Sequence, residues 1–367
     1  MEVTPYLKLM AEKKASDLFF CTGTAPHLKI EGNIRPVGTE KLAPGDVEKM
    51  ANIMMSEEQR TEFEKTFECN FAIPLHNVGR FRVNIFRQRG EVSVVIRYIQ
   101  SDIPRIEAMN LPKSLENIIM EKRGLVLVVG ATGSGKSTSL AAMIGHRNRN
   151  SASHILTIED PLEFIHNHDK SIVQQREVGI DTFSYENALK NALREAPDVI
   201  LIGEIRDMDT MKHAINYAET GHLCLATLHA NNANQALDRI LNFFPEVYHR
   251  QLLTDLSLNL RSIVSQRLLR GVDGKRVPAV EVMLNSPYIA ELITQGDIGG
   301  IKDAMKESTE EGTVTFDQAL LALYRKNLIT LDEAIQNADS KNDLNLAVRM
   351  GGDSDGNDED DSELILG

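Results

Sequence analysis

The sequence has few cysteines and no long apolar run, and each shortage excludes a class of protein. Cys21, Cys69 and Cys224 lie far apart in the 367 residues and fit neither a disulfide framework nor a paired-cysteine metal site. No stretch approaches the ~20 apolar residues of a membrane-spanning helix, and the first residues lack the parts of a signal peptide. We therefore expect a protein of the reducing cytosol with no direct membrane span.

Basic residues are also in short supply. Asp and Glu outnumber Lys and Arg by 53 to 40, which gives a net charge of −13 at pH 7. Because a polyanion repels nucleic acid unless a basic patch overrides its field, we expect no nucleic-acid partner. Residues 350–367 hold seven of the acids and no base, and this composition predicts a disordered acidic tail. A solubilising role fits this tail better than a binding role, and whether it regulates anything stays open.

The patterning of the chain changes near residue 100. Before that point, short helical patterns alternate with short strands, and the runs 80–86 and 92–99 predict a hairpin. Residues 1–100 therefore predict a small α+β domain. Residues 101–112 show no periodicity and contain prolines, which is typical of a linker.

Residues 113–270 alternate apolar runs with amphipathic helices. Apolar runs without polar alternation are typical of parallel strands that helices cover on both faces. The runs are 125–129, 155–158, 199–202 and 223–228. They predict a doubly wound α/β domain with a parallel-sheet core.

The rest of the chain looks helical. Residues 245–269 show one long helical pattern, and capping-box spacing of Thr315 with Gln318 and of Thr330 with Glu333 predicts helix starts. We expect a helical C-terminal region over 271–349.

One motif matches a phosphate-binding loop in full. The residues GATGSGKS follow the apolar run 125–129 and precede a helical pattern, as the G-x-x-x-x-G-K-[ST] loop requires. Glycines let the backbone amides surround the phosphates, Lys136 neutralises their charge, and Ser137 is a ligand for Mg²⁺. The motif predicts ATP and Mg²⁺ as ligands. The predicted nucleotide-binding residues of this loop are Gly130, Ala131, Thr132, Gly133, Ser134, Gly135, Lys136, Ser137 and Thr138.

Hydrolysis of a triphosphate also needs a carboxylate at the end of a neighbouring strand. An acid usually ends this strand directly, but here Gly203 follows the run 199–202 and Glu204 comes one residue later. This offset favours Glu204 as the base that activates the attacking water.

A second group of acids follows the run 155–158. Glu159, Asp160 and Glu163 lie there, and with Ser137 they are the residues on which metal coordination would rest. We predict Ser137, Glu159 and Asp160 as metal ligands and Glu163 as a catalytic acid. For Glu163, a solvated acid at a helix start is a serious alternative.

Two histidines and two arginines complete the candidates. His222 and His229 bracket the run 223–228, so they lie at opposite ends of one strand; each is either a hydrogen-bonded core residue or a sensor of the γ-phosphate. Arg82 and Arg97 lie on predicted strands of the first domain. They either form a loose basic surface or reach the nucleotide of a neighbouring subunit, which would require a ring.

Four motifs in one order resemble those of the secretion-superfamily ATPases, and within them the type IV pilus retraction ATPases of the PilT/PilU family. They are the Walker A residues 130–137, an Asp box at 158–164, an atypical Walker B at 193–207 and a His box at 219–229. Residues 15–18 and 80–84, with Arg97, resemble the PAS-like N-terminal domain of that family. Residues 242–245 and 339–344 resemble its PilU branch, and the stretch 287–293 differs from the PilT type.

The resemblance implies a RecA-like ATPase domain after a PAS-like domain. It implies a homohexamer with ATP at each junction between a RecA-like domain and a neighbouring N-terminal domain. It also implies an inner-membrane platform protein as a partner, and a PilT-type ATPase beside which this chain acts as an accessory motor of twitching motility. The chain would then be cytoplasmic and peripheral at the inner membrane.

The same resemblance implies roles for the candidate residues. Glu204 is the catalytic base, Glu159, Asp160 and Glu163 are the Asp-box acids, His222 and His229 belong to the His box, and Arg82 and Arg97 are arginines supplied to the nucleotide. Three other functions remain as alternatives. They are a ring subunit that binds ATP with little turnover, a RecA-like nucleic-acid motor, and an assembly ATPase of secretion or pilus extension.

Overall fold

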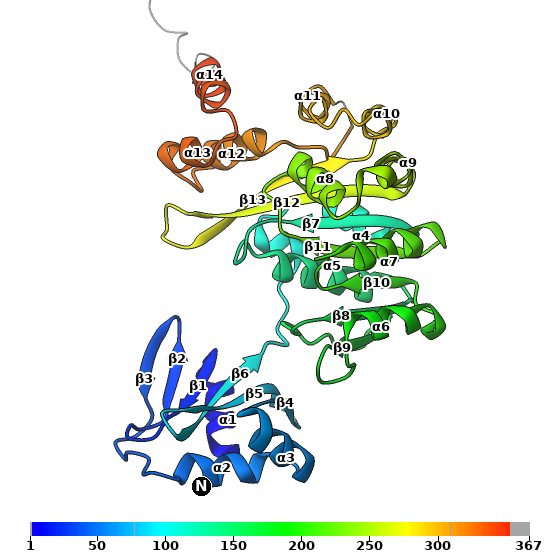
Figure 1. Ribbon diagram of the computed structural model, residues 1–367. Coiled ribbons are helices and arrows are strands. Elements are labelled where there is room, and N and C mark those ends of the chain that lie inside the picture. Colours follow the sequence, from blue (N-terminus) through cyan, green and yellow to red (C-terminus); the bar gives the residue numbers. More distant parts are fainter. Residues whose placement is uncertain (1, 77, 309, 353–367) are drawn as a thin grey trace, which may run out of the picture. The chain divides into compact units, whose positions relative to one another are not determined.

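A computed structural model describes residues 2–76, 78–308 and 310–352 of the chain (Figure 1). These residues form two compact units. One unit comprises Met1–Ile103 and Asn148–Gly203, and the other comprises Pro104–Arg147 and Glu204–Gly367. Residues 350–352 of the predicted tail belong to the last helix, and residues 353–367 lie outside the described residues.

The first part of the first unit is the predicted α+β fold. Six antiparallel strands run in the order β3-β2-β1-β6-β5-β4, and helices α1 (Thr4–Glu12), α2 (Asp46–Met54) and α3 (Glu57–Thr66) accompany them. The strands are β1 (Asp17–Phe20), β2 (His27–Ile30), β3 (Asn33–Pro36), β4 (Glu68–Leu75), β5 (Gly79–Gln88) and β6 (Glu91–Ile99). The predicted hairpin is confirmed, because β5 and β6 pair in register around a turn at Arg89 and Gly90. Alternate residues of β5, from Phe81 to Ile85, are fully buried in the core.

The second part of the first unit is parallel. Strands β8 (His154–Glu159), β9 (Ile172–Glu177) and β10 (Val199–Ile202) run in the order β10-β8-β9, and α6 (Tyr185–Ala192) packs against β8. All four residues of β10 are buried, as its unbroken apolar run predicts.

The second unit holds the other parallel strands. Strands β7 (Gly124–Val129), β11 (Leu223–Leu228), β12 (Leu260–Arg270) and β13 (Arg276–Leu284) run in the order β13-β12-β7-β11. The central strand β7 pairs in parallel with both β11 and β12, while β13 pairs with β12 antiparallel. The predicted α/β fold with parallel strands is confirmed.

Helices occupy the rest of the second unit (Figure 1). Around the strands lie a short 3₁₀ helix, η1 (Ile106–Met109), within the predicted linker, and α4 (Ser114–Met120), α5 (Lys136–Asn150), α7 (Met208–Glu219), α8 (Ala233–Asn242) and α9 (His249–Asn259). The C-terminal helices are α10 (Pro287–Gln295), α11 (Ile301–Lys306), α12 (Phe316–Arg325), α13 (Leu331–Asn337) and α14 (Lys341–Gly352). The predicted capping box of Thr315 and Gln318 is formed at the start of α12.

The prediction of one helix over 245–269 is wrong in its second half. Helix α9 ends at Asn259, and the residues from Leu260 onward form β12. Ile263 and Val264 are β-branched and fully buried, and they pair with Leu127 and Val128 of β7. Pairing with a strand more than a hundred residues earlier therefore overrides the local helical spacing.

The region 271–349 also contains a strand that the sequence did not indicate. Strand β13 includes Pro278, a residue that disfavours central strands and is tolerated at a sheet edge. In the second unit β13 has β12 as its neighbour and stands at the end of the strand order, which explains how the proline is accommodated.

Within the described part of the chain, no helix combines the length and the apolar character that crossing a bilayer requires.

The position of β7 between two strands gives a test of the fold. Leu127 is fully buried there, so Leu127→Ala should leave a cavity and lower the free energy of unfolding by about 3 kcal/mol. Val272→Ala, at a residue that is 59% exposed, is the control and should change it by less than about 0.5 kcal/mol. Urea denaturation followed by circular dichroism measures both. Equal stabilities of the two variants would contradict the central place of β7.

Candidate active site

The phosphate-binding loop lies at the end of β7. All six residues of β7 are buried, and its last residue, Val129, pairs with Leu228 and Ser265 on either side. Gly130 adopts a φ of +156° directly afterward, and a Cβ atom there would lie 2.5 Å from the Gln266 carbonyl oxygen. A side chain at this position would therefore collide with the backbone of β12, so only glycine fits.

Gln266 makes a second close approach to the loop. A Cβ atom on Gly135 would lie 2.7 Å from the side-chain amide nitrogen of Gln266, and φ at Gly135 is +91°. The amide oxygen of Gln266 accepts a hydrogen bond of 2.7 Å from the Ser139 hydroxyl in α5. The buried side chain of Gln266 thus fits between the loop and the helix that follows it.

Lys136 opens α5 and turns back over the loop. Its Nζ atom donates hydrogen bonds to the carbonyl oxygens of Gly130 (2.8 Å) and Ala131 (3.0 Å). Burial lowers the pKa of the lysine, and the charge of Glu204 opposes that shift. Ser137 follows in the first helical turn and is exposed, so its hydroxyl is accessible to a metal ion. The donor set therefore fits a phosphate with its divalent cation.

Glu204 and His229 meet beside the loop. The Glu204 Oε1 atom lies 3.0 Å from His229 Nε2, and His229 Nδ1 lies 3.3 Å from the Gly130 carbonyl oxygen. Arg206 contacts the other carboxylate oxygen through both Nε (2.8 Å) and a terminal nitrogen (2.7 Å). Two nitrogen-bearing side chains thus orient the carboxylate of Glu204.

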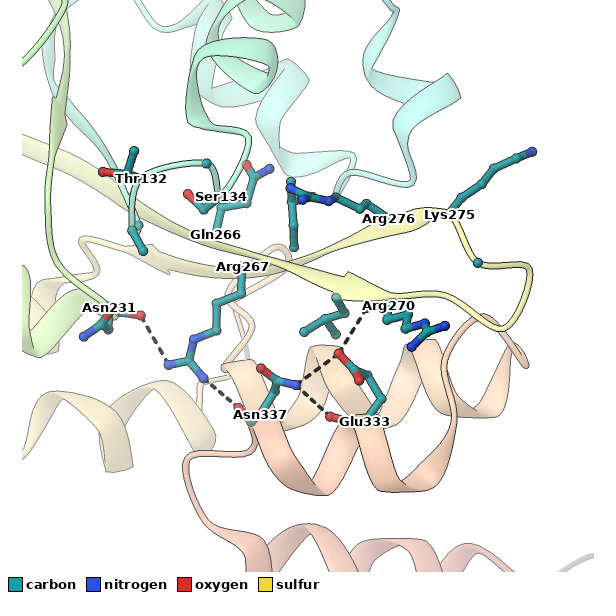
Figure 2. A pocket seen from close by; sticks show the side chains of 16 residues that line it. Thr132, Ser134, Asn231, Gln266, Arg267, Arg270, Lys275, Arg276, Glu333 and Asn337 are labelled. Carbon is teal, nitrogen blue, oxygen red and sulfur yellow. Dashed lines mark hydrogen bonds between the residues drawn. The ribbon is translucent and has the colours of Figure 1, made fainter. Parts of the chain in front are cut away.

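The loop lines a cavity of about 650 Å³ (Figure 2). Residues 130–134 form one wall, and β12, the β12–β13 turn and α13 form the others. Its size is in the range of small-molecule sites. Figure 2 shows Arg276 on the same side of the hairpin as Ser134 and Gln266, whereas Arg267 points toward Asn337.

The structure does not bring His222 to the loop. His222 precedes β11, and its backbone carbonyl accepts a hydrogen bond from Gly124, the first residue of β7. Its Nδ1 atom lies within 3.2 Å of the Tyr217 carbonyl and Thr220 hydroxyl oxygens. Within this unit, the length of β11, about 20 Å, separates His222 from His229.

The Asp-box acids lie in the first unit, at the end of β8. Glu159 Oε1 accepts hydrogen bonds from the Thr157 hydroxyl (2.7 Å) and the Gln175 amide (3.5 Å). Desolvation is the main cause that raises the pKa of Glu159 to about 7. The two hydrogen bonds lower the pKa, and the charge of nearby Glu163 raises it further. A bound cation would have the opposite effect on this pKa. Asp160 and Glu163 are exposed.

The glycine in the atypical Walker B motif has a steric cause. A Cβ atom on Gly203 would lie 2.7 Å from the Tyr185 hydroxyl oxygen and 3.0 Å from the Glu159 Cα atom. The Gly203 amide donates a 2.7 Å hydrogen bond to the Ile158 carbonyl oxygen, which fixes it against β8. A side chain at position 203 does not fit, so the first available carboxylate is that of Glu204.

Arg82 and Arg97 lie on strands, opposite each other in the register of β5 and β6. Arg82 donates hydrogen bonds from Nε to Glu177 (3.0 Å) and from a terminal nitrogen to the Leu162 carbonyl oxygen (3.3 Å). Arg97 Nε donates to Asp17 at 2.8 Å. Glu177 is buried, and burial raises its pKa while Arg82 lowers it. Both arginines thus have partners in their own unit.

The motifs did not point to several residues that shape the site. Glu177 and Gln266 each contact a predicted residue or the loop directly, and Arg206, which lies within the Walker B motif but was given no role, contacts Glu204. Glu281 is buried in β13 and accepts hydrogen bonds from the Ala233 amide and the Ser265 hydroxyl. The signal that could have found Gln266 and Glu281 is a polar residue inside an apolar strand pattern.

Burial of Glu159 predicts a pH dependence of stability. Its pKa rises from the ordinary 4.5 to about 7, so the folded protein holds a proton there that the unfolded chain releases. Ionisation therefore weakens the folded state as pH rises through this window. Glu159→Gln, without nucleotide or metal, should gain about 3 kcal/mol of unfolding free energy relative to the parent between pH 4 and pH 8.

Urea denaturation at the two pH values measures that gain. Glu64→Gln is the control, at an exposed acid of α3 that does not act on Glu159, and should leave the parent's pH dependence unchanged. A Glu159→Gln protein with the same pH dependence as the parent would show that folding does not raise the pKa of this carboxyl.

Comparison with known proteins identifies the family of this chain. Residues 3–317 match the family model of the Type II/IV secretion system protein. The chain is 54% identical to the type IV pilus ATPase PilU of Pseudomonas aeruginosa, over 97% of this chain and 93% of that protein. It is 38% identical to the PilT retraction ATPase of the same organism, over 92% and 98% of the two chains.

A solved structure agrees with these relatives. The crystal structure of the pilus retraction motor PilT with bound ADP superposes with a TM-score of 0.87 at 39% identity, and it covers 94% of this chain and 99% of that one. The resemblance inferred from the motifs is thereby confirmed. The chain belongs to the Type II/IV secretion system protein family, in the group that contains the pilus ATPases PilU and PilT.

Proposed function

We propose that this chain is an ATP hydrolase that powers retraction of a type IV pilus, as a homohexamer acting with a PilT-type partner on an inner-membrane platform protein. The observation that carries the hydrolase assignment is the contact of Glu204 with His229 beside the phosphate-binding loop. The high identity to PilU supports the accessory role. This role places the chain in the cytoplasm, peripheral to the inner membrane.

The loop and Lys136 bind the triphosphate. The amides at the start of α5 and the helix dipole attract the phosphate charge, and Lys136 exchanges the Gly130 and Ala131 carbonyls for phosphate oxygens. Ser137 would hold Mg²⁺, with Glu159 and Asp160 as the candidate acids for that ion. Bound Mg²⁺ would neutralise charge on the phosphates.

Glu204 accepts the proton of the attacking water. Its carboxylate is already oriented by His229 and Arg206, so one of these contacts must open for water to reach an oxygen atom. His229 spans the distance between Glu204 and the Gly130 carbonyl, so it can report the position of the γ-phosphate to the base. Glu163 remains a proposed member of the site, whereas His222 lies at the far end of β11 from the loop.

Arg82 and Arg97 are the proposed cations that complete the site of a neighbouring subunit. Each is paired with a carboxylate in its own unit, so reaching a nucleotide requires exchange of Glu177 or Asp17 for phosphate. Such an exchange would couple nucleotide turnover to movement of the PAS-like domain.

Two variants separate binding from chemistry. Glu204→Gln should bind ATP as the parent does and lose about 10²- to 10⁴-fold in turnover, since it lacks the general base. Lys136→Ala should lose nucleotide binding itself. Equilibrium binding of a fluorescent ATP analogue and steady-state phosphate release measure the two effects.

The control is Glu246→Gln, an exposed acid shortly before α9 and outside the four motifs, which should leave both quantities unchanged. Full turnover in Glu204→Gln would show that another group is the base. Phosphate release at background level in the parent itself, with ATP bound, would replace the hydrolase assignment by a non-hydrolysing ring subunit.

Mixing experiments test whether Arg82 acts on a neighbour. Arg82→Gln should slow turnover by about 10³-fold or more if its charge reaches the transition state. Mixed with Glu204→Gln subunits, it should regain activity, because about a quarter of random junctions then join an intact Glu204 to an intact Arg82. Phosphate release after subunit exchange is the readout. Two inactive proteins that stay inactive when mixed would mean that Arg82 does not act across a junction.

A further inference from the structure

The cavity beside the phosphate-binding loop has a cationic wall. Arg267, Arg270, Lys275 and Arg276 line it, and Glu333 is the acid among its described lining residues. Only Arg267 is well neutralised, because Asp339 lies 2.9 Å from its guanidinium. Arg267 also lies over the Phe316 ring, 3.9 Å from the centroid, so it is part of the packed core.

The other three cations are exposed and weakly paired. Arg270 and Arg276 are paired in the backbone register of β12 and β13, and neither has an acidic partner within 4.0 Å among the described residues. Lys275 lies 3.8 Å from Asp273, and both side chains are mostly exposed, so this pair contributes little. The turn of the hairpin therefore presents three positive charges that the described residues do not balance.

The chain carries the complementary charge in its last fifteen residues. Residues 353–367 hold seven acids and no base, and include the apolar run 364–366 before Gly367. The acids are Asp353, Asp355, Asp358, Glu359, Asp360, Asp361 and Glu363. In a protein whose binding loop serves a polyanion, this segment has the charge to compete for the same surface.

The connection to α14 puts this segment within reach of the cavity. Leu344, in the first turns of α14, is buried in one cluster with Leu269 of β12 and Val277 of β13. Gly352 follows Leu344 by eight residues, about 12 Å along a helix. Fifteen extended residues span up to ~50 Å. The acidic segment can therefore return to the hairpin against which its helix is anchored.

We propose that residues 353–367 bind to the hairpin surface formed by Arg270, Lys275 and Arg276 in the same chain and compete there with nucleotide. Phosphates and the segment's carboxylates cannot share these three cations without mutual repulsion. The competition rests on the proposed nucleotide site, whereas binding of the segment does not.

Tethering sets the size of the effect. A short flexible linker gives an effective concentration on the order of 1 mM. If the free segment binds with a dissociation constant of ~100 μM, the apparent affinity for nucleotide falls about tenfold, and at ~1 mM it falls about twofold. Because all the charges are exposed, the effect should fade as ionic strength rises.

The test uses the full chain with the seven acids of the segment replaced by their amides, so that length and shape are kept. The probe is a fluorescent peptide with the sequence 353–367, and anisotropy measures its binding to this chain. Adding Arg270→Gln and Arg276→Gln should weaken peptide binding at least tenfold. The control variant carries Lys122→Gln and Arg123→Gln, which remove the same amount of charge just before β7, away from the loop. It should bind the peptide as tightly as the chain without these two changes.

A second measurement addresses the competition. At low salt, the amide chain should bind a fluorescent ATP analogue about two- to tenfold more tightly than the parent, and the difference should vanish at 0.5 M salt. No peptide binding, or equal loss of binding in both double variants, would overturn the docking surface. Peptide binding with equal nucleotide affinity in the two chains would overturn the competition, and loss of nucleotide binding in both chains would instead contradict the proposed ATP site.

Discussion

The close packing of two loop glycines against one residue of β12 is the constraint on which the site depends. Gly130 meets the backbone of Gln266, and Gly135 meets its side chain. The loop that follows β7 thus takes its shape from a strand that begins 130 residues later, at Leu260. Since β12 also carries the hairpin that packs on α12–α14, the loop and the C-terminal helices share one support.

The secondary structure predicted from the sequence was most accurate where burial alone decides the structure. The runs 199–202 and 223–228 coincide with β10 and β11, because strands buried on both faces must be apolar throughout. Prediction failed at β12, where the apolar spacing suits a helix and pairing with β7 decides otherwise. Such pairing joins residues that are distant along the chain, and no local pattern records it.

The candidate residues were easier to predict than their partners. The motif supplied Lys136 and Glu204, and the structure brings both to the loop, together with His229. It could not supply Glu177 or Gln266, because a contact such as that between Arg82 and Glu177 joins residues 95 positions apart. Sequence therefore predicts which groups carry the chemistry, and the fold decides which charges hold them in place.

The contact between Tyr185 and Gly203 also bears on how such sites diversify. The two positions share one small volume against β8, so a gain in size at one must be matched by a loss at the other. Relatives that place an aspartate at position 203 should carry a smaller residue than tyrosine at position 185. If positions 185 and 203 covary in this way across the family, the pair distinguishes members with the carboxylate at position 203 from members with it at position 204.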